Sequence, residues 1–212
     1  METTFLQGWS TIPLVLAAGI VLGQCCDQVV CRLADHSRSG LSVAITATVL
    51  LAVIWSLAAT PDRQVMSCVL GCALIALAAI DLLTMQLPDL LTLPLLACGF
   101  LLSLKIGEPG LLDRAAGAFL GYGSLAVLGF IYRSMRGRDG LGLGDAKLVG
   151  AAGAWLGWAA LPSVLLLGSS FGLLWALVRR RSDPGSAPRP LPFGPALAAA
   201  FWLVWLYGPI RF

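Results

Sequence analysis

Apolar residues run along this chain in eight blocks separated by short polar breaks. At about 1.5 Å of rise per helical residue, the longer blocks can each cross the roughly 30 Å hydrocarbon layer of a bilayer. The pattern therefore predicts an all-α fold, a polytopic membrane helix bundle of about eight transmembrane segments, with residues 1–212 forming a single membrane-embedded domain. The sixth block is short for a full crossing. The predicted spans are residues 12–30, 41–59, 65–83, 90–104, 115–132, 147–158, 161–178 and 195–207.

Composition supports lipid as the surrounding medium. Hydrophobic residues make up 58% of the chain and charged residues 12%, well outside the averages of soluble proteins. The net charge is only +3, and the basic residues lie in the polar breaks instead of forming one continuous face, so nucleic-acid binding is not indicated. The six cysteines contain no Cys-x-x-Cys pair of the kind that holds zinc, and no metal site is predicted.

The distribution of Lys and Arg predicts the orientation of the spans, because cytoplasmic loops carry the excess of positive charge. The breaks that follow odd-numbered spans contain ten basic residues and the other side contains four, so both termini are predicted outside the cytoplasm. The ten are Arg32, Arg38, Arg133, Arg136, Arg138, Lys147, Arg179, Arg180, Arg181 and Arg189; the four are Arg63, Lys105, Arg114 and Arg211. This orientation places Asp81, near the inner end of the third span, and Asp145, in the loop before the sixth, at the cytoplasmic face.

Ionisable side chains within or beside membrane spans are costly to bury and are functional candidates by default. Two carboxylates brought together in a partly dehydrated site share one proton, because both cannot ionise cheaply. The ionised carboxylate can activate water, while its protonated partner can hydrogen-bond a scissile carbonyl. Gly142 and Gly144, just before Asp145, have no Cβ and would let an extended substrate backbone come close. We therefore expect Asp81 and Asp145 to act as a catalytic pair.

Two ordered motifs carry a family resemblance. The first is Gly142-Leu-Gly-Asp145-Ala-Lys147, and the second begins at Asp81 and continues through Leu-Pro88-Asp89 to Leu-Thr-Leu-Pro94. Together they resemble the bacterial type IV prepilin peptidases, which are intramembrane aspartyl proteases of the Gly-x-Gly-Asp type. The segment Pro192-Phe-Gly-Pro195, which opens the last span, is similar to a further motif of that family.

The resemblance implies a specific reaction. The protein would be an aspartic endopeptidase of the bacterial inner membrane that cleaves the basic leader from type IV prepilins or type II secretion pseudopilins at the cytoplasmic face. Asp81 and Asp145 would be catalytic, and the peptidase would need no cofactor or metal. The residues expected to shape the site or bind substrate are Pro88, Asp89, Gly142, Gly144 and Lys147.

The motifs leave two of these residues with alternative roles. After Pro88, Asp89 could cap the fourth span or shape the site. Lys147 could tune Asp145, hold a lipid phosphate or serve as a positive-inside anchor. All of these roles stay open at the level of the sequence.

The chain departs from the longer family members between its first two spans. Those members carry a cytoplasmic domain with two Cys-x-x-Cys pairs there, whereas only residues 34–40 fill the gap here. The longer enzymes also methylate the new N-terminus with S-adenosylmethionine. A bifunctional peptidase and N-methyltransferase is therefore one alternative, and S-adenosylmethionine is a cofactor only if methylation is retained.

Functions from other classes predict different patterns. In a small proton- or cation-coupled transporter, the two aspartates would line a path across the bilayer, whereas the charge distribution places both at one face. A non-enzymatic scaffold would explain the glycines spaced four apart, which let helices approach closely, but not the two aspartate motifs. These glycine pairs are Gly117 and Gly121, Gly153 and Gly157, and Gly168 and Gly172.

Overall fold

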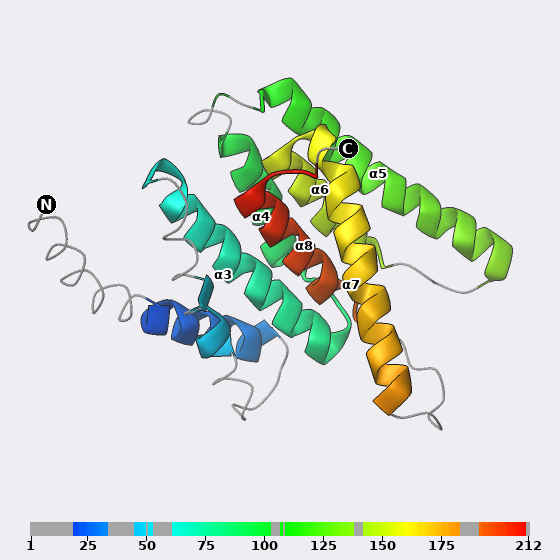
Figure 1. Ribbon diagram of the computed structural model, residues 1–212, viewed down its shortest axis with the longest axis horizontal. Helices are drawn as coiled ribbons and strands as arrows, with labels where there is room; N and C mark the ends of the chain where they lie inside the picture. The colour runs from blue at the N-terminus through cyan, green and yellow to red at the C-terminus, as the bar shows by residue number, and fades with distance from the viewer. Residues whose placement is uncertain are drawn as a thin grey trace, which may run out of the picture. The chain divides into compact units, whose positions relative to one another are not determined.

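Each of the eight apolar blocks contains helical residues in the computed structural model (Figure 1), so the predicted all-α membrane helix bundle is confirmed. The structure describes residues 19–33, 45–49, 51–52, 61–102, 107, 109–137, 142–182 and 191–210. Parts of the first two predicted spans and the 34–40 linker lie outside these ranges. So do five of the basic residues counted for topology: Arg38, Lys105, Arg138, Arg189 and Arg211.

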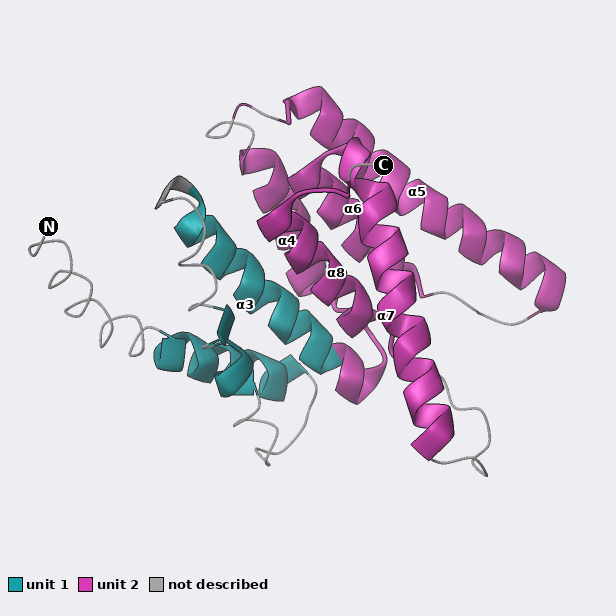
Figure 2. Cartoon of the chain, in the orientation of Figure 1, with its two compact units in different colours: residues 1–80 teal, residues 81–212 magenta. Residues whose placement is uncertain are grey.

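The chain divides into two compact units, Met1–Ile80 and Asp81–Phe212 (Figure 2). Helix α3 (Pro61–Thr84) runs through the boundary, so that Asp81 is the first residue of the second unit. The prediction of a single domain over residues 1–212 stays a prediction.

In the first unit, the helix at residues 19–33 lies against both of its described neighbours. A Cβ added to Gly23 would lie 2.9 Å from Cα of Thr46, so only glycine permits this approach. The thiol of Cys26 donates a weak hydrogen bond to the carbonyl of Cys72 on α3, with Sγ and O 3.7 Å apart. Val30, Val49 and Leu70 are fully buried and form the apolar part of the unit.

The second unit is built around α6 (Leu143–Leu156), which contacts all four of the other α-helices that begin in this unit. These are α4 (Asp89–Leu102), α5 (Leu111–Arg136), α7 (Leu161–Ser182) and α8 (Gly194–Tyr207), with a short 3-10 turn at Trp158–Ala160 before α7. Residues 148–155 of α6 are all buried, and most are alanine or glycine. Small side chains let helix backbones approach closely, so α6 can be surrounded on several sides.

The predicted packing glycines bring α5 and α6 into backbone contact. A Cβ on Gly153 would lie 2.1 Å from the carbonyl oxygen of Gly117, and one on Gly121 would lie 2.6 Å from that of Val149. Gly168 and Gly172 of α7 similarly face Leu197 and Phe193 at the start of α8.

Gly157 has a different role from the one its spacing predicts. Its φ of +80° ends α6 in a conformation that L side chains rarely adopt. Its amide donates to the carbonyl of Gly153, which completes the helix end.

Arg114 is only 1% exposed and joins the ends of two helices. Its Nη1 lies 3.2 Å from the carbonyl of Gly99 near the end of α4, and 3.1 and 2.7 Å from those of Ala154 and Trp155 at the end of α6. Carbonyls in the last turn of a helix lack intrahelical partners and lie at the negative end of its dipole. Arg114, expected to be a loop charge, is instead a buried side chain that satisfies both helix ends.

Trp155 fixes the same end of α6 to two other helices. Its indole Nε1 donates to the carbonyl of Leu95 on α4 at 2.7 Å. Its ring packs edge-on against Phe201 and Trp205 of α8, with centroids 6.4 and 5.3 Å apart. Such edge-to-face contacts are a favoured arrangement of aromatic rings.

Within the described residues, three helical stretches are long and apolar enough to cross a membrane: Arg63–Thr84, Leu111–Arg136 and Trp158–Ser182. Two shorter apolar helices, Asp89–Leu102 and Gly194–Tyr207, accompany them. Large apolar side chains such as Phe119, Phe130 and Leu173 are exposed on α5 and α7. In water such surfaces would be unfavourable, so their exposure fits helices that face lipid.

Candidate active site

Asp81 lies in the last turns of α3 and is buried, with 5% of its surface exposed. The backbone N–H of Gly194, the first residue of α8, donates a hydrogen bond to its Oδ2 at 2.9 Å. The first N–H groups of a helix lack intrahelical partners and lie at the positive end of the dipole, so this position favours a negative charge. The start of α8 therefore both orients and stabilises the Asp81 carboxylate.

Gly194 is a site residue that the sequence pattern alone did not single out. A Cβ at this position would lie 2.7 Å from Oδ2 of Asp81, so a larger residue would displace the carboxylate. The available signal was the Pro192-Phe-Gly-Pro195 motif, whose second proline starts α8. Hydropathy could not reveal it, because the interacting group is a backbone amide.

Asp145 lies in the first turn of α6, so the helix begins before the predicted boundary at residue 147 and the residue is not in a loop. Burial and, to a smaller extent, the negative charge of Asp81 raise the pKa of its carboxyl to about 6, against the opposing effect of a backbone hydrogen bond from Gly142. Asp81 is thus close enough to Asp145 for a direct electrostatic effect. The structure brings together two carboxylates that are far apart in the sequence.

The two motifs also touch through Gly144. A Cβ on this residue would lie 2.8 Å from Cβ of Leu87, which belongs to the loop between α3 and α4. Gly144 therefore lets the first turn of α6 lie directly against Leu87, next to Pro88 and Asp89. At Gly142 a Cβ would make only an ordinary contact, 3.5 Å from Oδ2 of Asp145. The predicted role of both glycines in admitting a substrate backbone stays a prediction.

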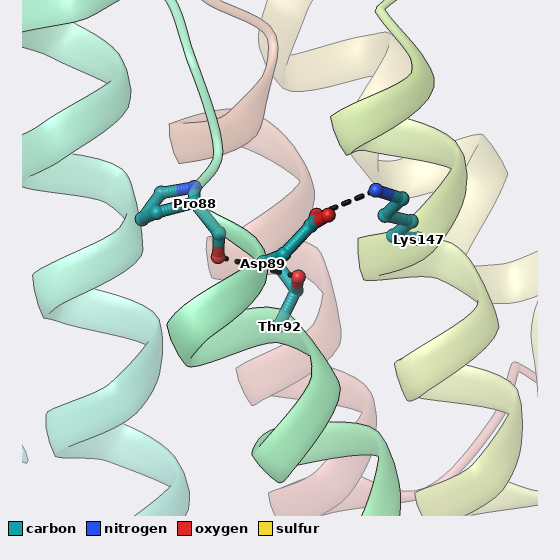
Figure 3. A network of polar contacts seen from close by, with 4 residues as sticks. All are labelled: Pro88, Asp89, Thr92 and Lys147. Atoms are coloured by element: carbon teal, nitrogen blue, oxygen red, sulfur yellow. Dashed lines mark hydrogen bonds and ion pairs between the residues drawn. The ribbon is translucent and has the colours of Figure 1, made fainter.

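Pro88 and Asp89 start α4 beside the first turn of α6 (Figure 3). The Pro88 carbonyl accepts the N–H groups of Leu91 and Thr92, at 3.1 and 3.2 Å, and the Thr92 hydroxyl at 3.3 Å. The Asp89 side chain points to Lys147, with Oδ1 and Nζ 2.5 Å apart. The ion pair between Asp89 and Lys147 links α4 to α6, a role that the sequence did not suggest for either residue.

Met85 ends α3 in a strained conformation. Its φ of 54° places an L side chain in the left-handed region, and its N–H donates to the carbonyl of Asp81 at 2.9 Å. The chain thereby turns away one helical turn after Asp81 and enters the loop that leads to Asp89. Strain of this kind is found where the surrounding structure fixes a functional segment.

The fold and site define a polytopic helical membrane protein with an interacting aspartate pair in its second unit. Residues 68–177 match the family model described as the type IV leader peptidase family. The chain belongs to this family. Both members of the aspartate pair lie inside the matched region.

Curated relatives extend the similarity beyond that region. The chain is 42% identical over 181 residues to the prepilin leader peptidase/N-methyltransferase of Aeromonas salmonicida, covering 84% of this chain and 61% of the relative. The chain is 36% identical over 204 residues to the protein of the same name from Pseudomonas aeruginosa. It is 32% identical over 219 residues to the one from Neisseria gonorrhoeae. These alignments cover 96% and 97% of this chain, and 68% and 73% of the relatives. The chain thus spans about three fifths of the length of the Aeromonas relative. No solved structure matches the chain.

Proposed function

We propose that this protein is a prepilin leader peptidase, an aspartic endopeptidase that removes the basic leader from type IV prepilins or type II secretion pseudopilins. The observation that carries the proposal is that Asp81 and Asp145 lie close enough to interact electrostatically, in a chain of the type IV leader peptidase family. The relatives bear the same activity in their names.

The reaction follows from a pair that holds one proton. The ionised carboxylate takes a proton from water as the water oxygen attacks the scissile carbonyl carbon, and the protonated carboxyl donates its proton to the carbonyl oxygen. The tetrahedral intermediate then collapses: the amide nitrogen gains a proton, the C–N bond breaks, and the pair returns to its starting protonation state. Every proton in this reaction is held by Asp81, Asp145, water or substrate, so the step as proposed needs no metal or cofactor.

The cytoplasmic face of the bacterial inner membrane is the proposed place of cleavage. Arg133 and Arg136 end α5, whose connection leads directly to the start of α6 and Asp145, and Arg179, Arg180 and Arg181 end α7. These charges favour an inside location for the helix ends that carry them. The exposed apolar faces of α5 and α7 would contact membrane lipid.

N-methylation is proposed only as a second activity, separable from cleavage. The relatives' names pair the two activities. The 34–40 linker, where the longer family members carry their cysteine-rich domain, lies outside the described residues. Mass spectrometry of the mature pilin N-terminus, with and without added S-adenosylmethionine, tests this activity: a methylated amine establishes it, and a free amine assigns the chain cleavage alone.

A proton- or cation-coupled transporter is not favoured by the same observations. The two aspartates interact with each other, whereas relay groups would be spread along a path through the bilayer.

Co-expression with candidate prepilins tests the peptidase. Asp81→Asn and Asp145→Asn are each expected to abolish leader removal while membrane insertion persists. Leader removal is measured as the shift in the electrophoretic mobility of the prepilin. Asp113→Asn is the matched control, because Asp113 is an exposed carboxylate in the first turn of α5 that accepts a hydrogen bond from Trp158 at 3.2 Å. Normal processing by both active-site variants would exclude the mechanism.

A further inference from the structure

Lys147 and Asp89 are not needed for the proton transfers of the proposed reaction, yet their ion pair lies two residues from Asp145 (Figure 3). We propose that Asp89 and Lys147 are a positioning pair that fixes the first turn of α6 to α4 and so holds Asp145 toward Asp81. The kinetic part of this proposal rests on the proposed peptidase function, whereas its structural part does not.

The direction of the two side chains supports this role. Residues two apart on a helix point to different sides, so Lys147 and Asp145 do not compete for the same space. While Asp145 interacts with Asp81, Lys147 reaches across to the start of α4. The ion pair therefore fixes the rotation of this turn about the helix axis without blocking the carboxylate.

A second contact holds the same turn from its other end. Gly144, immediately before Asp145, lies against Leu87, and Lys147, shortly after it, binds Asp89. Leu87 and Asp89 belong to one short segment that Met85 joins to Asp81 through its backbone hydrogen bond. The segment from Met85 to Asp89 is thus a short physical link between the helix that carries Asp81 and the helix that carries Asp145.

The first turn of α6 depends on such external contacts. Its N-cap residue is Gly142, which offers no side-chain hydrogen bond to the free N–H groups of the turn. The ion pair itself is partly exposed, with 31% of the Lys147 side chain and 57% of the Asp89 side chain accessible. Exposed pairs contribute little to the free energy of folding, so breaking this one is expected to alter geometry without unfolding the protein.

A titration measures the proposed positioning without relying on activity. The pKa of Asp145 is followed by carboxyl ¹³C NMR in detergent micelles, in wild type, Asp81→Asn, Asp89→Asn/Lys147→Gln, and the triple variant. The double variant removes one charge of each sign and keeps the net charge unchanged. In the wild-type background, Asp81→Asn is expected to lower the pKa of Asp145. In the double-variant background the same substitution is expected to lower this pKa by clearly less, because loss of the ion pair lets the two carboxylates move apart. An equal effect in both backgrounds would overturn the proposal.

Kinetics with a purified prepilin provide the second test. Asp89→Asn and Lys147→Gln are each expected to lower kcat on the order of 10- to 100-fold with little change in KM, since a misplacement of about 1 Å costs up to that much. The exchanged pair Asp89→Lys/Lys147→Asp is expected to recover most of the lost kcat, and Asp113→Asn is the control. A raised KM without recovery in the exchanged pair would instead assign the two residues to substrate binding.

The two tests separate the proposals from each other. If wild type does not cleave prepilin, the proposed function fails and the titration alone decides the positioning pair. If wild type cleaves and the titration shows equal coupling in both backgrounds, only the positioning pair is rejected.

Discussion

The backbone amide of Gly194 donates its hydrogen bond to Oδ2 of Asp81 across a sequence separation of 113 residues. One carboxylate of the pair is thereby held by the helix that begins at the Pro-Phe-Gly-Pro motif. The position of α8 is consequently part of the proposed active site.

Replacing Gly194 tests this relationship directly. In Gly194→Ala the new Cβ would meet the Asp81 carboxylate at 2.7 Å and displace it, so leader cleavage is expected to fall on the order of 100-fold. Gly123→Ala is the control, because a Cβ there meets nothing within 4 Å. Cleavage rates of purified protein provide the measurement, and an unimpaired Gly194→Ala enzyme would contradict the geometry.

The raised pKa of Asp145 predicts a pH-dependent stability. The pKa of the Asp145 carboxyl is about 6 in the folded protein, compared with an ordinary value of 3.8. The folded protein therefore keeps the carboxyl proton to a higher pH than the unfolded chain does. The stability that the protonated group contributes is fully present below the unfolded pKa and is lost as the pH rises through the folded one. Asp145→Asn, which does not titrate, is therefore expected to exceed wild type in Tm at about pH 7.5, and by less at about pH 4.5. A Tm difference independent of pH would argue against a raised pKa.

Removing the guanidinium of Arg114, which donates hydrogen bonds to the helix ends, is expected to cause a large loss of stability. Arg114→Met leaves carbonyls at the ends of α4 and α6 buried without their partner, at a cost of about 3 kcal/mol or more in the free energy of unfolding. Arg136→Met, at the exposed far end of the same helix, is expected to change stability by less than about 0.5 kcal/mol. Chemical unfolding in detergent micelles compares the two, and equal effects would refute the structural role of Arg114.

A glycine in place of Met85 is expected to increase the stability of the protein. Met85→Gly removes the left-handed strain at φ 54° and is expected to raise the free energy of unfolding by about 1 kcal/mol. The same change at Met135, in the last turn of helix α5, relieves no such strain and is expected to lower it. Loss of stability at both positions would show that Met85 is not strained.

The sequence predicted the parts of this protein that follow from local pattern. Apolar blocks located the helices, and the Asp81 and Asp145 motifs located two carboxylates that the structure brings close enough to interact electrostatically. Hydropathy does not encode which helices touch, so it could not show that Gly194 holds Asp81 or that Arg114 is buried between helix ends. The start of α6 was also placed too late, because Asp145 and Gly144 interrupt the apolar run although they belong to the helix.

The shortness of α6 bears on how water would reach the peptide bond in the proposed reaction. A helix of 14 residues rises about 21 Å, clearly less than the roughly 30 Å thickness of a hydrocarbon layer. Placed across such a layer, its two ends could not both reach undeformed headgroups, and the shortfall would be met by local thinning of the membrane or by a hydrated recess. In the proposed peptidase, such thinning or such a recess would let water reach the peptide bond beside Asp145, in the first turn of this short helix.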